Sequence, residues 1–188
     1  MGNLASRLVV LPMILAAASG ADGQAVPGQC GYERWPVKIL ADRDRARVDF
    51  KPIDTTVAKL VAILIHEIPY PEDRRIEPEE FRVYRVRARL LAVYREKDHD
   101  LHLIIADLGA PDAHMIAEIP APECVAQHQD EYREARSVAL RAAHNTVLEL
   151  VGVGFFDFLH DQRGVAKNGI ELHPVLSLRV LDSTKEIH

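Results

Sequence analysis

The sequence predicts a mainly β (α+β) fold, and three observations carry this prediction. One long segment alternates apolar and polar residues, and four shorter apolar segments are bounded by turn residues. Before the last two of these segments, the apolar residues of another segment recur at helical spacing. Of the 188 residues, 48% are hydrophobic and 27% are charged, which is typical of a chain with a core. The order β-β-β-α-β-β is that of an OB-like five-stranded barrel, and an α+β sheet with a helix on one face is the alternative.

Residues 1–25 are expected to be an export signal peptide. Arg7 is the only charged residue before an apolar run from Leu8 to Ala18, and small residues follow up to Ala25. The run is short for a bilayer and contains a proline, so we expect cleavage rather than a retained anchor, and no stable membrane span afterwards. The protein is therefore expected to be exported, either periplasmic or extracellular.

Residues 26–78 are expected to form an N-terminal extension with one helix. Pro36 favours an extended conformation for Tyr32–Leu40. Asp54 is a candidate N-cap for a helix over Thr55–Glu67. The apolar residues of this helix have the spacing of one buried face, and they are Val57, Leu60, Val61 and Leu64.

Residues 79–182 are expected to form the OB-like barrel, followed by a tail over residues 183–188. The strongest strand pattern runs over Phe81–Tyr94, where even-numbered positions are apolar and Arg85, Arg87 and Arg89 share the other face. This strand contains no glycine, although the first strand of such a barrel bends sharply. A helix is expected over Val125–His144, which has a narrow apolar stripe at helical spacing. The other expected strands are Leu101–Ala106, His114–Ile119, Thr146–Phe156 and Ile170–Val180.

The chain has two cysteines, Cys30 and Cys124. An even pair in an oxidising compartment is expected to form one disulfide that ties the extension to the barrel, and two buried free thiols are the alternative. Neither cysteine has a neighbour at zinc-finger spacing, which disfavours a cysteine-based metal site.

Polar residues are concentrated before and within the last expected strand. A loop between two strands is well placed to meet a ligand, and residues two apart on a strand share a face. His102 would join this segment only from a cross-strand position beside Glu118 or His173. The candidate ligand-binding residues are Asp157, His160, Gln162, Asn168, Glu171 and His173.

Three hypotheses for this segment remain open. In the first, the side chains hydrogen-bond the loop and fill polar gaps. In the second, they contact a ligand. In the third, His160, Glu171 and His173, together with Asp157, bind zinc or another divalent metal, although no fixed-spacing signature supports such a site. No other cofactor is expected.

The row of Arg85, Arg87 and Arg89 is a candidate for weak nucleic-acid binding. The net charge of −5 and the scarcity of aromatic residues near the row make nucleic acid an unlikely main partner. The favoured interpretation is a solvent-exposed face paired with acidic residues such as Glu118 or Glu149.

Four segments together resemble an uncharacterised family of exported bacterial proteins. These segments are CGYERW (30–35), HLIIAD (102–107), MIAEIP (115–120) and GFFDFLHDQRGVAKNGIELHPV (154–175). The resemblance extends over residues 30 to 180, and the last segment is its most specific part. It implies a bacterial, exported origin and no known activity.

These observations favour an exported ligand-binding or structural module that uses the surface of residues 157–173, rather than an enzyme. Its partner would be a small molecule, an oligosaccharide or a protein. The alternative is a metal-dependent hydrolase of phosphodiesters or glycans, with Glu171 as the base and histidines as metal ligands. Nucleophilic catalysis has little support, because the chain lacks Gly-x-Ser-x-Gly and a phosphate-binding Gly-Lys-Thr loop.

Overall fold

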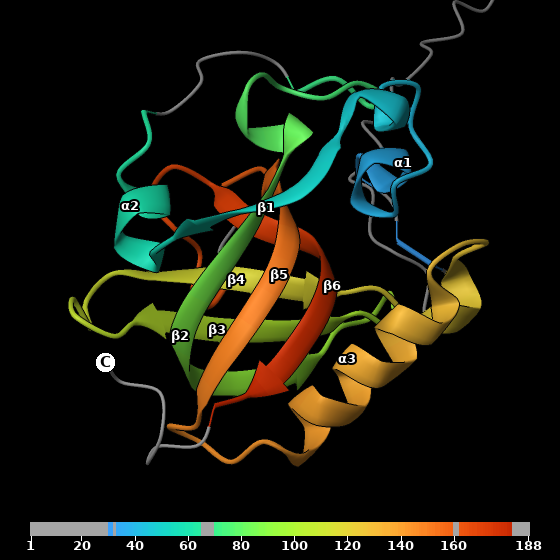
Figure 1. Cartoon of the computed structure of the whole chain (residues 1–188). Coiled ribbons are helices and arrows are strands. Elements are labelled where there is room, and N and C mark those ends of the chain that lie inside the picture. Colours follow the sequence, from blue (N-terminus) through green and yellow to red (C-terminus); the bar gives the residue numbers. More distant parts are fainter. Residues whose placement is uncertain (1–29, 32, 65–69, 160–161, 182–188) are drawn as a thin grey trace, which may run out of the picture.

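The computed structural model describes residues 30–31, 33–64, 70–159 and 162–181, so the expected signal peptide and tail lie outside the described residues. All five expected barrel strands and the long helix are present. In chain order the helices and strands are α1 (Trp35–Lys38), β1 (Asp49–Thr55), α2 (Val57–Val61), β2 (Arg82–Arg95), β3 (Leu101–Asp107), β4 (His114–Ile119), α3 (Gln129–Arg141), β5 (Val147–Phe156) and β6 (Ile170–Val180) (Figure 1). Short 3₁₀ turns lie at residues 45–47, 79–81 and 122–124.

Strand β2 closes the barrel because it pairs with two other strands. Its first half is antiparallel to β5 from Val83 to Arg89, and its second half is antiparallel to β3 from Ala88 to Arg95. The ring therefore runs β2-β3-β4-β6-β5 and back to β2, with β4 and β6 parallel (Figure 1). This closed five-stranded sheet confirms the predicted OB-like barrel.

The bend of β2 arises without a glycine. The register of β2 against β3 shifts between Leu90 and Ala92. An extra residue in one strand bends that strand and increases its twist. The irregularity in pairing therefore provides the curvature for which the sequence offered no glycine.

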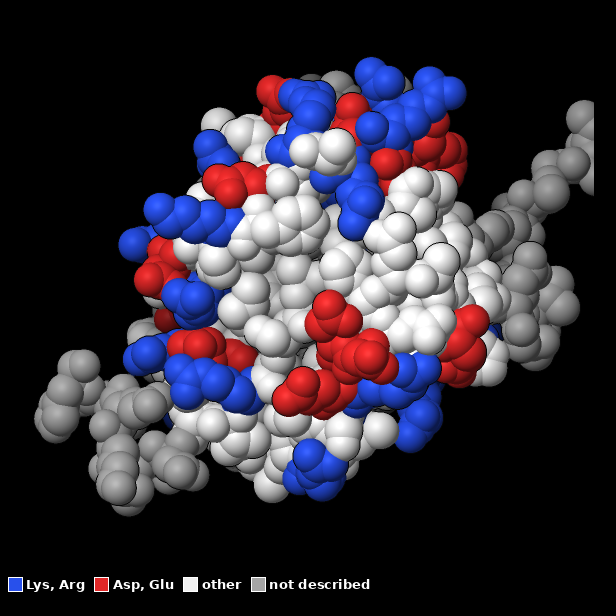
Figure 2. Space-filling model, turned by 45° about the vertical axis from the view of Figure 1, so that its right-hand side comes forward, with Lys and Arg blue, Asp and Glu red and all other residues white. Residues whose placement is uncertain are grey.

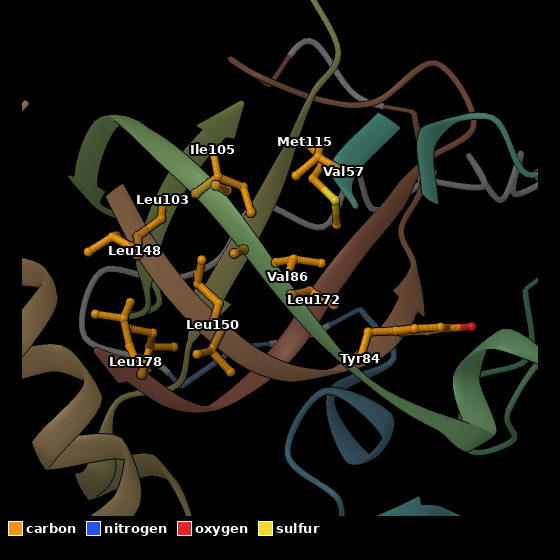
Figure 3. Packing of buried hydrophobic residues seen from close by; sticks show 14 of the residues in the cluster. Val57, Tyr84, Val86, Leu103, Ile105, Met115, Leu148, Leu150, Leu172 and Leu178 are labelled. Carbon is orange, nitrogen blue, oxygen red and sulfur yellow. The ribbon is translucent and has the colours of Figure 1, made fainter. Parts of the chain in front are cut away.

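The apolar face of β2 points into the barrel, as its alternation predicts. Tyr84, Val86, Ala88 and Leu90 are all buried, and they pack among leucines from β3, β5 and β6 (Figure 3). Helix α3 adds the buried residues Tyr132, Ala135 and Ala139 to the same core. Burial of a large aliphatic side chain stabilises the fold by about 1.5–3 kcal/mol relative to exposure, so this shared core makes the strands and α3 one unit.

The segment Trp35–Lys38 is helical, so the prediction of an extended conformation there is wrong. Pro36 lies in the first turn of α1. A backbone N–H in the first turn has no partner within the helix, so proline is tolerated at that position. The proline therefore marks the beginning of a helix rather than an edge strand.

Strand β1 occupies Asp49–Thr55, a segment for which the sequence predicted no strand. Its side chains are mostly exposed, so the sequence shows no alternation of apolar and polar residues there. It also contains Pro52, which is tolerated in an edge strand. It pairs with β2 in parallel, with Asp54 opposite Arg85. The predicted cap is therefore wrong: the N-cap of α2 is Thr56, and α2 ends at Val61. Residues 65–67 of the longer helix that was expected lie outside the described residues.

A disulfide and a buried ion pair are among the links that hold the extension on the barrel. A disulfide joins Cys30 to Cys124 across 94 residues and confirms the predicted pair. The fully buried guanidinium group of Arg34 forms a two-point ion pair with Glu80, with distances of 2.7 and 2.8 Å. Arg34 also lies 4.7 Å from the centre of the Phe155 ring, so the beginning of α1 covers the outer side of β5. No described helix is long and apolar enough to cross a membrane.

Candidate functional site

The predicted site residues on β6 lie on the outer face of the barrel wall. Glu171 and His173 face outward because the residues between and beside them, Ile170 and Leu172, face the core. Strand β4 runs parallel to β6 and brings Glu118 to within 3.0 Å of His173 Nδ1.

Strand β3 and two segments outside the strands complete the group. Strand β3 places His102 directly opposite Glu118, which is the cross-strand position that the site required. Lys38 of α1 lies 3.1 Å from the Asp157 carboxylate, and Asp100, in the turn before β3, lies 3.5 Å from His173 Nε2. We call the following seven residues, none more than 9% exposed, the polar cluster: Lys38, Asp100, His102, Glu118, Asp157, Glu171 and His173.

Sequence reasoning missed Lys38 and Asp100 as members of the polar cluster. Asp100 ends a polar turn next to a strand, and its proximity to a strand terminus was the only available signal. The sequence contained no signal for Lys38, because the position of this side chain depends on how α1 packs against the barrel.

His102 is held between two hydrogen-bond acceptors. Its Nδ1 lies 2.9 Å from Glu118 Oε1, and its Nε2 lies 2.9 Å from the carbonyl oxygen of Arg163. Both ring nitrogens must therefore donate, which makes this side chain an imidazolium. Burial alone would lower the pKa of His102, but the hydrogen bond to Glu118 and the charge of that carboxylate raise it to about 9.

His173 is fully buried among carboxylates. Its Nδ1 lies 3.9 Å from Glu171 Oε2, in addition to the contacts with Glu118 and Asp100. The Phe155 ring meets its imidazole edge to face at 5.5 Å, which fixes the plane of the ring. Burial alone would lower the pKa of His173, but the carboxylates, Asp100 first, raise it well above its ordinary value.

The two glutamates of the polar cluster have opposite shifts in pKa. Burial opposes ionisation of Glu118, but its hydrogen bond to His102 and its close contact with His173 outweigh burial and lower its pKa. Burial and the nearby charge of Asp157 raise the pKa of Glu171 to about 7. Glu118 is therefore ionised at neutral pH, whereas Glu171 is a carboxyl group that ionises near neutral pH.

The other predicted binding residues are not part of this cluster. Asn168 Nδ2 donates to the carbonyl oxygens of Leu60 and Ile63 at 3.0 Å, so it fixes the end of α2 to the loop before β6. Gln162 lines a shallow hollow of about 280 Å³ beside His102. His160 lies outside the described residues.

The structure corrects the expectation that the 157–173 segment presents its polar groups at the surface. Asp157, Glu171 and His173 do converge, but each is at most 2% exposed, and Lys38 of α1 pairs with Asp157. Their role in ligand binding remains a prediction.

The arginine row forms an ion-paired face, as the favoured interpretation predicts. Glu149 is the direct cross-strand partner of Arg87 on β2 and of Arg179 on β6. Its carboxylate lies 3.2 Å from Arg87, 2.9 Å from Arg179 and 3.8 Å from Arg85. Partial burial opposes ionisation, but the hydrogen bonds from Arg179 and Arg87 lower the pKa of Glu149. Arg89, the last of the predicted row, instead donates to the carbonyl oxygen of Asn145.

Arg85, Arg87 and Arg179 line a groove of about 790 Å³ on the outer face of β2, β5 and β6. Two further acidic residues, Asp54 and Asp107, also line the groove. Asp54 pairs with Arg85 at 2.9 Å but its side chain is 79% exposed. Asp107 accepts backbone hydrogen bonds from Ala58 and Gly109, which satisfy its carboxylate within the protein.

The comparisons with known proteins add likeness to the fold only. No protein-family model and no curated protein matches the chain. A protein described as an aspartyl-tRNA synthetase from Leishmania major Friedlin is similar over 71% of this chain and 21% of its own, with 9% identity and a TM-score of 0.43. An asparaginyl-tRNA synthetase from Entamoeba histolytica is similar over 70% of this chain and 23% of its own, with 12% identity and a TM-score of 0.42.

A tRNA fluorescent labeling enzyme is similar over 56% of this chain and 30% of its own, with 14% identity and a TM-score of 0.29. The chain thus spans about a fifth of the length of the two synthetases. Likeness at these scores carries no argument about function.

Proposed function

We propose that this chain is an exported, non-catalytic binding module that takes a small acidic ligand in the arginine-lined groove. The disulfide between Cys30 and Cys124 and the signal-like N-terminal sequence support export. The burial of the polar cluster disfavours the alternative of a metal-dependent hydrolase, because a substrate could not reach Glu171 as a base.

The observation that carries the proposal is the convergence of three guanidinium groups on one carboxylate. Arg85, Arg87 and Arg179 all lie within 4.0 Å of Glu149. Guanidinium groups bind carboxylates and phosphates through parallel hydrogen bonds. Of the other two acidic residues that line the groove, Asp107 is held by backbone N–H groups and Asp54 pairs with Arg85, so a ligand would meet Arg87 and Arg179 beside Glu149. The groove therefore favours a second anion beside Glu149.

The dimensions and the surrounding charges favour a small ligand over a polymer. A volume of about 790 Å³ lies within the usual range of small-molecule sites, roughly 300–1,000 Å³. The face seen in Figure 2 carries small groups of both charges and no continuous basic patch. With a net charge of −5, the protein lacks the extended positive field that a nucleic-acid backbone requires.

The test is a titration of purified protein with inorganic pyrophosphate and, separately, with galacturonate. Binding is measured by calorimetry and by changes in NMR chemical shifts. We expect Arg87→Gln and Arg179→Gln each to weaken binding of the responding probe by about tenfold or more, which corresponds to one charged hydrogen bond. Glu149→Gln should strengthen binding, because it removes the carboxylate that competes with the ligand for the same arginines.

Arg89→Gln is the matched control, because Arg89 lies on the same face of β2 but does not line the groove. This variant should bind the probe as the wild type does. Equal losses in the Arg89 and Arg87 variants, or no binding of either probe by the wild type, would overturn the proposal.

A further inference from the structure

We propose that the polar cluster contains a divalent-metal site, with Asp100, Glu118 and His173 as its ligands. One candidate ligand atom from each of these residues lies within 4.8 Å of the other two. The three residues come from the turn before β3, from β4 and from β6, and all are buried. The site is separate from the arginine-lined groove, so it does not depend on the proposed function.

Both carboxylates are held by one oxygen and present the other to His173. Asp100 Oδ1 accepts a hydrogen bond from the backbone N–H of Ala121 at 3.0 Å, and Glu118 Oε1 accepts one from His102 at 2.9 Å. The second oxygens, Asp100 Oδ2 and Glu118 Oε2, lie 3.5 and 3.0 Å from the His173 ring nitrogens. Carboxylates that bind metals are commonly oriented by such outer hydrogen bonds.

Several buried polar atoms at and around His173 lack a hydrogen-bond partner within the part of the chain that the structure describes. Among the described residues, neither ring nitrogen of His173 has a hydrogen-bond partner with good geometry, and the same is true of Asp100 Oδ2 and both carboxylate oxygens of Glu171. His173 and Glu171 are at most 1% exposed, and a buried polar atom without a partner costs about 1–3 kcal/mol. A metal ion would satisfy several of these lone pairs at once.

The spacing at His173 suits tetrahedral coordination. Two ligand atoms bound about 2.1 Å from one tetrahedral ion lie about 3.4 Å apart. The distance between His173 Nε2 and Asp100 Oδ2 is 3.5 Å. Glu118 Oε2 lies at the other ring nitrogen, 3.0 Å from Nδ1, so a side chain must rotate before Asp100 and Glu118 can share one ion with His173.

The donor set favours zinc. An imidazole nitrogen together with carboxylate oxygens is typical of Zn²⁺, whereas Ca²⁺ and Mg²⁺ are bound by oxygen atoms alone. Zn²⁺ is therefore the probe for this site.

The test uses the full protein with its disulfide intact, stripped of metal by a chelator and dialysed to equilibrium against Zn²⁺. We expect one zinc per chain by elemental analysis. X-ray absorption should show one imidazole nitrogen with oxygen ligands. Asp100→Asn keeps an oxygen for the Ala121 N–H but removes the charged ligand, so zinc affinity should fall tenfold or more.

Asp42→Asn is the matched control, because Asp42 is also a buried aspartate but pairs with Arg75 outside the polar cluster. This variant should bind zinc as the wild type does. If Asp100→Asn does not fold, Glu118→Gln replaces it, since its amide oxygen can still accept from His102. Substoichiometric zinc in the wild type, a zinc spectrum without histidine, or equal affinity in the ligand and control variants would overturn the proposal.

Discussion

Loss of the Arg34 side chain should destabilise the protein strongly. The guanidinium group is fully buried and donates to both carboxylate oxygens of Glu80 at 2.7 and 2.8 Å. It also donates to three carbonyl oxygens, those of Pro71, Arg74 and Phe156, at 2.7 to 3.0 Å. Arg34→Met would leave all of these acceptors without their donor and Glu80 as a buried charge without a cation.

The magnitude follows from that uncompensated charge. Removal of one partner from a buried ion pair costs about 3–5 kcal/mol, which is a large part of the roughly 5–15 kcal/mol that stabilises a typical domain. Because Glu80 also accepts from the backbone N–H groups of Ile76 and Phe156, its carboxylate cannot turn to solvent without further loss. We therefore expect Arg34→Met to lower the free energy of unfolding by the full amount of about 3–5 kcal/mol.

Equilibrium unfolding in urea measures this change. At a slope of about 2 kcal/mol per molar, a loss of 3–5 kcal/mol moves the midpoint of Arg34→Met down by about 1.5–2.5 M. Arg34→Lys keeps the charge but not the planar guanidinium group, so its stability should lie between those of the wild type and Arg34→Met. The double variant with Glu80→Gln carries no buried charge and should be more stable than Arg34→Met alone. A midpoint within about 0.5 M of the wild type, or additive losses in the double variant, would refute the reasoning.

Two further predictions concern the disulfide and a capped carboxylate. Replacement of Cys30 and Cys124 by serine should lower the free energy of unfolding by about 4.5 kcal/mol, because the disulfide closes a loop of 94 residues in the unfolded chain. A loss below about 1 kcal/mol, measured by unfolding in urea, would contradict this. Burial opposes ionisation of Asp107, but three backbone N–H groups outweigh it and lower its pKa. Its contribution is therefore complete above the ordinary pKa of about 3.9 and is lost as the pH falls through the lowered value. Asp107→Asn should cost about 1–2 kcal/mol at pH 7 and show less acid destabilisation than the wild type; parallel pH profiles of stability would rule this out.

The barrel could be predicted from the sequence because its signals are local. The alternation along β2 sets which residues face the core, whatever strand lies beside it. Helix α3 shows its apolar stripe within its own residues. The disulfide followed from the presence of two cysteines and no other candidate partner. The carboxylate opposite the arginine row was also foreseen, since Glu149 lies on a neighbouring strand of the same face.

Contacts between distant segments decided the rest. Strand β1 has few buried side chains, so no periodicity revealed it, and it exists because β2 offers a free edge for parallel pairing. The candidate site was predicted as an exposed surface, yet Glu171 and His173 are buried, and Lys38 and Asp100 belong to the same cluster. The sequence determined by itself which residues can form strands, a helix and a disulfide, because these depend on neighbours in the chain. Only the tertiary structure decided which charged groups meet and lose contact with water, because that depends on strand register and on where the extension packs.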